Sequence, residues 1–204
     1  LKTAINGLLW DQSTGAYEDN GYTNGASSSP LHSQDGNSLA VWFGVVDSQA
    51  RAWQVLTYLK GNWNQYGATA PEWGGKISPF PGSMEVYAHF AGGDDLGGLA
   101  LIRREWGYML SSTKGTGSTF WEGYDAQGAF AYNRYYPGGP AGSYTSLAHG
   151  WSTGPTGALT SDVLGIAPES AGGQTYQVIP HPGNLTWADG RLTMPAGTVA
   201  VSWR

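Results

Sequence analysis

The sequence predicts a mainly α chain in which paired helices are followed by a short antiparallel β-segment. Apolar residues recur at the helical period of 3.6 over most of the chain before Pro168, and long loops rich in Gly, Pro and Asn separate these stretches. After Pro168 the apolar period changes to two, which is typical of strands. Antiparallel helix pairs whose long loops gather at one end describe a helical toroid or bundle, and such loops form the binding face.

Each expected helix is placed by its apolar stripe and by residues that suit helix ends. Ser, Asp and Asn accept hydrogen bonds from the first N–H groups of a helix, and Gly suits the position just past its end. The last helix is the weakest, because Pro155 and three glycines interrupt its first half. The expected helices run from Leu1 to Trp10, from Asn37 or Ser38 through Val45, from Asp47 or Ser48 to Gly61, from about Gly82 to Phe90, from Asp94 or Asp95 to Leu110, and from about Ser146 to Leu164.

The β-segment is read from alternating apolar residues. Ala188-Asp189-Gly190 has the residue types of a hairpin turn. The expected strands are Thr175–Ile179, Leu185–Ala188, Arg191–Met194 and Thr198–Val201. The chain begins within a helical pattern and stops within a strand, so we expect a piece of a longer protein.

Composition narrows the classes of function. Charged residues make up only 12%, whereas there are 10 Trp and 12 Tyr, a balance that suits an extracellular protein with a neutral, hydroxylated ligand. A formal charge of -5 without any Lys/Arg cluster argues against nucleic acid as a partner. No apolar run has the length of a membrane span, so no membrane partner is expected. There are no cysteines, and the four histidines show no metal-ligand spacing, so neither a metal nor another cofactor is expected.

The stretch from Gly117 to Asp125 contains the main candidate for chemistry, Glu122, which follows Trp121 directly. An indole ring offers an apolar face to the C–H side of a pyranose, and a carboxylate can take a proton from water or hold a hydroxyl. The simpler alternative is that Trp121 is a core anchor and Glu122 a solvated loop acid.

Several stretches in series resemble the C-terminal half of an α-L-rhamnosidase, a member of the inverting glycoside hydrolases built on an (α/α)6 barrel. Each stretch is weak evidence alone, and their order and spacing carry the resemblance. They are Leu1–Tyr17, Asn37–Asp47, Ser78-Pro79 followed by Glu85, Leu101–Leu110, Ser118–Glu122, Ser146–Trp151 and Gly165–Pro168. The resemblance implies that residues 1–168 form the C-terminal half of a six-hairpin toroid and residues 169–204 the start of a C-terminal β-sandwich.

The resemblance also assigns roles. It implies that Glu122, in the Trp-Glu motif with Trp121, is the general base that activates water, and that His149 contacts the sugar. The family's general acid lies in a motif that precedes Leu1, so the missing N-terminal part of the same enzyme is the expected partner. An inverting glycosidase needs two carboxyl groups, and for that reason we expect the isolated chain to lack activity. The expected substrate carries terminal α-L-rhamnose, and a secreted enzyme is expected.

Four further residues are candidates for substrate binding, and three of them have a structural alternative. Asp125 has the position to orient Glu122 or a sugar hydroxyl, or is a plain solvated acid. Trp151 follows His149 closely and belongs to the same motif. Glu85 lies near the start of a helix, where the helix dipole alone explains an acid. Trp73 lies on a long loop and is either a sugar subsite or a loop anchor.

Two other classes of function stay open at this point. The first is a non-catalytic carbohydrate-binding or structural module that kept half of the barrel. The second is a uronic-acid hydrolase or a polysaccharide lyase of the toroid type. A lyase needs a cation to neutralise a uronate, yet the stretch from Gly115 to Asp125 has no Lys or Arg, and Arg134 is the nearest candidate in the following loop.

Overall fold

The computed structural model describes residues 1–19, 31–132 and 145–204. Arg134 therefore lies outside the described residues. The helical part contains α1 (Lys2–Leu8), α2 (Gln34–Trp42), α3 (Gln49–Gly61), α4 (Pro79–Ala91), α5 (Asp95–Ser111) and α6 (Gly154–Ala158). Four two-stranded antiparallel sheets pair β1 (Trp10–Asp11) with β2 (Ala16–Tyr17), β3 (Thr69–Ala70) with β4 (Lys76–Ile77), β5 (Ile166–Pro168) with β6 (Tyr176–Val178), and β7 (Ala188–Met194) with β8 (Gly197–Trp203).

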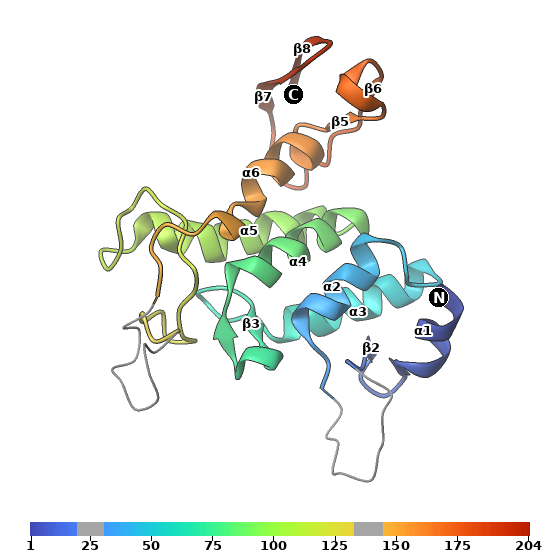
Figure 1. Cartoon of the computed structure of the whole chain (residues 1–204), viewed down its shortest axis with the longest axis vertical. Helices are drawn as coiled ribbons and strands as arrows, with labels where there is room; N and C mark the ends of the chain where they lie inside the picture. Colours follow the sequence, from blue (N-terminus) through green and yellow to red (C-terminus); the bar gives the residue numbers. More distant parts are fainter. Residues whose placement is uncertain (20–30, 133–144) are drawn as a thin grey trace.

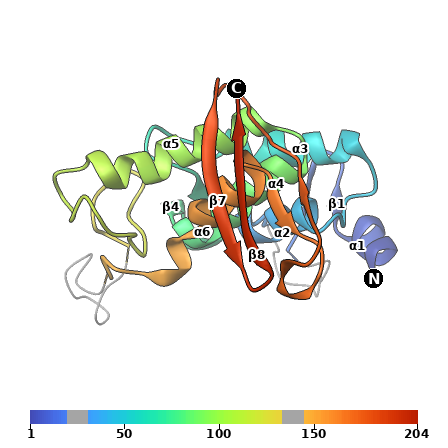
Figure 2. The same ribbon diagram turned by 90° about the horizontal axis from the view of Figure 1, so that it is seen from above.

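Helices α2 to α5 form the body of the chain, and β7 and β8 project from it on the far side of α6 (Figure 1). Helix α4 packs against both α2 and α5, so it lies at the centre of the helical part. Seen from above, the β7–β8 hairpin crosses over the helices as a separate ribbon (Figure 2). The predicted class, helices with short antiparallel strand pairs, is confirmed, but the pairs β1–β2 and β3–β4 lie among the helices and not after them.

Two buried clusters hold the helices together. One joins α2, α3 and α4 through side chains such as Val41, Leu56 and Ala88. The other joins α4 and α5 to the segment after α5, through Phe90, Leu101 and Trp121 among others. The second cluster fixes the segment that carries Glu122 onto the helices.

The predicted helix ends are partly confirmed. Ser48 caps α3 by accepting from the Arg51 N–H, and Asp94 caps α5 by accepting from the Gly97 N–H. Helix α2 begins earlier than predicted, because Ser33 rather than Asn37 or Ser38 is its cap. Helix α4 also begins earlier, at Pro79, which suits a first helical position because its missing N–H would have no partner there.

The single helix predicted from about Ser146 to Leu164 is wrong in its first half. Residues 146–149 are not helical, and a short 3-10 helix (Gly150–Ser152), α6 and a π-helical turn (Leu159–Val163) follow. The hydroxyls of Thr160 and Ser161 donate to carbonyls four residues earlier, Thr156 O and Gly157 O. Such bonds compete with the helical ladder, which accounts for the irregular second half.

The predicted hairpin turn at Ala188-Asp189-Gly190 is also wrong. Those residues begin strand β7, and the turn falls at Pro195-Ala196, between paired Met194 and Gly197. A glycine suits this strand position because Leu164 packs against it: Leu164 Cδ2 would lie 2.8 Å from an added Cβ. Close packing of the β7–β8 hairpin on the helical part thus explains Gly190, which the sequence suggested was a turn residue.

No helix in the described ranges is both long enough and apolar enough to cross a membrane.

Candidate functional site

Glu122 lies in an extended segment that is hydrogen-bonded to a second predicted stretch. The Glu122 N–H donates to Ser146 O at 2.9 Å, and the His149 N–H donates to Phe120 O at 2.8 Å. The Ser146 N–H in turn donates to Glu122 Oε2 at 2.8 Å, so the half-buried carboxylate is oriented by backbone. The fold therefore brings the Trp-Glu stretch and the His149 stretch side by side.

Trp121 points away from that surface and into the core. None of its side chain is exposed, and its ring makes edge contacts with Tyr108, Tyr124 and Phe130 at centroid distances of 5.7, 5.7 and 4.8 Å. Its backbone carbonyl accepts from Ser152 Oγ at 2.7 Å. Trp121 thus anchors the segment, and its ring has no exposed face in the described structure.

His149, Trp151 and Phe80 form a partly exposed aromatic group next to this segment. The Trp151 ring lies 4.4 Å from the His149 ring and stacks on Phe80 at 4.8 Å, with centroids compared in both cases. Trp151 is 48% exposed and Phe80 39%. Sequence analysis missed Phe80, although it directly follows the Ser78-Pro79 pair that belongs to the resemblance.

Trp73 contacts the site through Tyr132, a residue that no pattern in the sequence pointed to. The two ring centroids are 6.2 Å apart, and Tyr132 Oη donates to Ser78 Oγ at 3.0 Å. Burial raises the pKa of Tyr132, the Ser78 hydroxyl opposes the rise, and the Glu122 carboxylate adds to it. Trp73 itself is 53% exposed, so its ring is accessible.

Glu85 is fully buried and lies at the centre of a polar network rather than on a surface. Its oxygens accept from Gln34 Nε2 at 2.7 Å and from Trp63 Nε1 at 2.5 Å, and Oε1 lies 3.5 Å from His89 Nε2. His89 Nδ1 in turn lies 2.9 Å from Asp94 Oδ2. The network ties α2 and α4 to the segment just after α3 and to the cap of α5.

Two other acids near the site are engaged by backbone. Asp125 Oδ1 accepts from the N–H groups of Gln127 and Ala129 and so closes its own loop. Glu72 accepts from the N–H groups of Gln34 and Asp35, at 2.9 and 3.2 Å, and thereby caps the first turn of α2. Burial raises the pKa of Glu72, and these N–H groups oppose the rise.

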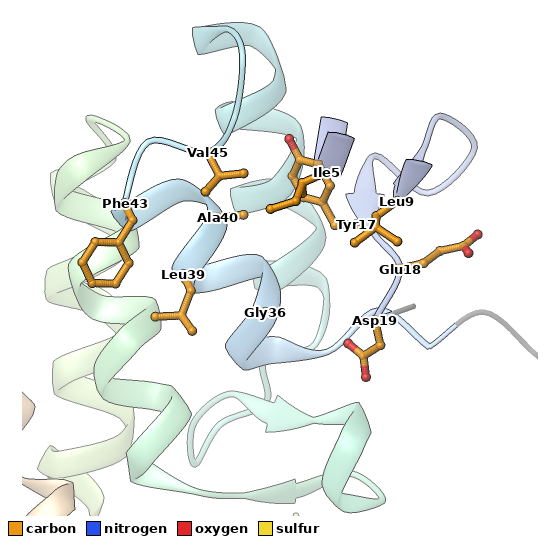
Figure 3. A pocket seen from close by; sticks show the side chains of 10 residues that line it. All are labelled: Ile5, Leu9, Tyr17, Glu18, Asp19, Gly36, Leu39, Ala40, Phe43 and Val45. Carbon is orange, nitrogen blue, oxygen red and sulfur yellow. The ribbon is translucent and has the colours of Figure 1, made fainter. Parts of the chain in front are cut away.

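Two further features of the described residues lie apart from Glu122. A hollow of about 300 Å³ between α1, β2 and α2 is lined by apolar side chains such as Leu9, Leu39 and Phe43 (Figure 3). Asp11 and His32, with Glu18, place possible metal-ligand atoms within 4.8 Å of one another. The tertiary structure, not sequence spacing, brings these three together. Neither feature contains a predicted site residue.

Comparison with solved structures gives two relevant neighbours. A GH78 family rhamnosidase of Bacillus sp. GL1 is 28% identical with a TM-score of 0.71, over 99% of this chain and 19% of its own. A rhamnosidase from Klebsiella oxytoca, with rhamnose bound, is 18% identical with a TM-score of 0.54, over 78% of this chain and 26% of its own. The second likeness shows the fold alone.

No family model matches the sequence, and a search of curated proteins finds no match. The resemblance to α-L-rhamnosidases is nevertheless confirmed by structure, and it extends over nearly the whole chain. The chain spans only about a fifth of the length of the Bacillus enzyme, 19%.

Proposed function

We propose that this chain is part of a glycoside hydrolase that removes terminal α-L-rhamnose from a glycoside or polysaccharide by inverting hydrolysis. The observation that carries the proposal is the pairing of the Phe120–Glu122 segment with Ser146–His149. That pairing sets a half-buried carboxylate beside an imidazole and an exposed indole, in a chain whose fold resembles rhamnosidases.

Glu122 is the general base in this proposal. Its carboxylate accepts a proton from a water molecule, and the oxygen of that water attacks the anomeric carbon from the face opposite the leaving group. The hydrogen bond from the Ser146 N–H holds the carboxylate in one orientation.

The general acid comes from polypeptide outside this chain. Inverting enzymes place their two carboxyl groups about 6.5–9.5 Å apart so that a water fits between base and sugar. Among the described acids near Glu122, Glu85 is buried in its network, Glu72 caps α2 and Asp125 closes a loop. The proposal therefore includes an N-terminal part of the same enzyme, which supplies the acid and completes a toroid of six helix hairpins.

The sugar lies against the accessible aromatic side chains. His149 donates to a sugar oxygen and Trp151 covers the C–H face, while the exposed Trp73 forms a second contact. Trp121 and Glu85 act indirectly, because both are buried and hold the segments that carry the site. An extracellular location is part of the proposal and is supported by the low charge and high aromatic content.

The test compares hydrolysis of 4-nitrophenyl α-L-rhamnoside by the chain alone and by the product of its complete reading frame. The longer product should be active and the chain alone inactive. Glu122→Gln in the longer product should lower kcat by about 10²–10⁴-fold. The exposed acid Glu169 provides the control, since Glu169→Gln should leave the rate unchanged. An unaffected rate in the Glu122 variant would remove that residue from the mechanism.

A binding measurement distinguishes the hydrolase from the alternative, a non-catalytic carbohydrate-binding module. If the longer product binds methyl α-L-rhamnoside by saturation-transfer NMR but never hydrolyses an aryl rhamnoside, the module replaces the hydrolase. Initial release of the β-anomer, followed by NMR, would establish inversion. Initial release of the α-anomer would contradict it.

A further inference from the structure

Glu105 is a buried carboxyl group without a cation beside it. It lies in α5, and none of its surface is exposed. Its Oε2 accepts one long hydrogen bond, 3.5 Å from the Ala68 N–H, and Oε1 has no hydrogen-bond partner among the described residues. No ion pair in the described part of the chain includes Glu105. An ionised carboxylate in such surroundings is strongly disfavoured, whereas a neutral carboxylic acid is tolerated.

The space for this carboxyl group is made by two glycines. A Cβ at Gly82 in α4 would lie 2.5 Å from Glu105 Oε1, and one at Gly67 would lie 2.9 Å from Oε2. Gly67 also has a φ of 154°, a conformation that side chains rarely adopt. The backbone of two separate segments therefore closes directly around the acid.

Burial and the neighbouring Glu85 favour the neutral form of Glu105, and the Ala68 N–H opposes them. Burial raises the pKa of Glu105 well above its usual value, and the Glu85 carboxylate on α4 raises it further. Tyr124, in the segment after α5, donates its hydroxyl to Tyr66 O at 2.8 Å, and the same hydroxyl lies 3.4 Å from the Glu105 carbonyl oxygen. Burial also raises the pKa of Tyr124, so this neighbour stays neutral as well. Tyr108, on the same helix as Glu105, contacts the Tyr66 and Tyr124 rings.

Glu105 is also connected to the segment that carries Glu122. Tyr124 exchanges two backbone hydrogen bonds with Ile77, and its ring packs edge-on against Trp121. A movement of Gly67 and Ala68 away from α5 therefore disturbs Tyr124, which supports residues 120–125.

We propose that Glu105 is a neutral carboxylic acid in the folded chain and that its proton acts as a switch. While the proton is bound, Gly67–Ala68 stays packed against α5 and Tyr124 supports residues 120–125. Loss of the proton places a second negative charge near Glu85, at a fully buried position where no ion pair among the described residues includes Glu105. The response is local opening, in which Gly67–Ala68 moves off α5 and lets water reach the carboxylate. The inference itself stands on the geometry of Glu105. Its consequence for hydrolysis rests on the proposed function: activity should fall as pH rises, and the fall should come from Glu105 and not from Glu122.

The sign of the pH effect follows from linkage. The unfolded chain releases the Glu105 proton near pH 4.3, the usual value for glutamate, whereas the folded chain retains it to a higher pH. Between these two values the folded state binds one more proton, so its stability falls as pH rises. For one proton, the unfolding equilibrium constant should rise about tenfold for each pH unit in that interval.

The first experiment measures urea unfolding of the chain across that pH interval, followed by circular dichroism. Relative to wild type, Glu105→Gln should lack the tenfold rise per pH unit, because its amide cannot ionise. Glu105→Met, which also cannot ionise, serves as a second variant if the first does not fold. Glu169→Gln, at an exposed acid, should keep the wild-type dependence. Parallel curves for wild type and the folded Glu105 variants would overturn the proposal.

The second experiment detects the proton and the opening directly. Infrared spectra of wild type at neutral pH should contain the C=O band of a buried protonated carboxyl group, and this band should be missing from Glu105→Gln. Hydrogen exchange, corrected for intrinsic rates, should lose protection at residues 66–68 and 120–125 as pH rises in wild type only. The β7–β8 hairpin is the internal control. A wild type without the carboxyl band, or with equal exchange in both proteins, would refute the switch and leave the proposed hydrolysis untouched.

Discussion

Replacing Trp121 by alanine should be among the most destabilising single changes in the helical part, because the ring is wholly buried. A buried aromatic side chain removes about 150–250 Å² from water. At about 25 cal/mol per Å² this burial contributes about 4–6 kcal/mol. Measured truncations of buried Phe and Trp cost about 3–5 kcal/mol. Trp121→Ala should therefore lower the free energy of unfolding by about 4 kcal/mol, a large part of the 5–15 kcal/mol typical of a domain.

The assay is thermal and urea unfolding followed by far-ultraviolet circular dichroism, which does not depend on the indole that is removed. For a chain of this length, about 4 kcal/mol corresponds to a fall in Tm of about 8–16 °C. Trp187 provides a matched control, since its side chain is 64% exposed. Trp187→Ala should change stability by less than about 0.5 kcal/mol. Equal losses in the two variants would refute the assignment of Trp121 as a core anchor and restore it as an exposed sugar platform.

Two further predictions concern helix capping and a buried histidine. Ser48→Ala should lower the free energy of unfolding in urea by about 1 kcal/mol, because it leaves an N–H at the start of α3 without its acceptor. The control, Ser202→Ala at an exposed serine, should lower it by less than about 0.5 kcal/mol. Equal losses would contradict the role of Ser48 as a cap. Burial opposes protonation of His89, but Asp94 and Glu85 outweigh it and raise the His89 pKa. Its stabilising contribution should thus be complete below the unfolded histidine pKa of about 6.5 and lost as pH rises through the folded value. In thermal unfolding, His89→Gln should remove that loss, and an unchanged pH dependence would show that the histidine is neutral.

Local signals in the sequence predicted the framework of this chain well. The 3.6-residue period located the main helices, and residue type narrowed the caps of α3 and α5 to pairs of neighbours that include Ser48 and Asp94. The change of period near Pro168 marked the end of the helices, although two short strand pairs also lie among them. These features depend on side chains only a few residues apart, which is why they can be read without knowing the fold.

Features that depend on distant segments were predicted less well. Asp189-Gly190 has the composition of a turn, but it lies in a strand that pairs with β8, and Leu164 packs against Gly190. Local signals for helix likewise failed over residues 146–149, where backbone groups instead pair with Phe120 and Glu122. In both places a tertiary contact outweighed local propensity.

For the candidate site, the sequence by itself determined which residues have the chemistry: a carboxylate at Glu122, an imidazole at His149 and aromatic rings around them. Only the tertiary structure decided their environments. It buried the Trp121 ring, left Trp151 accessible against Phe80, and enclosed Glu105 between two glycines without a cation. The reason is physical: the type of a side chain is fixed by its covalent structure, whereas its burial and its proton affinity are set by whichever remote segments fold against it.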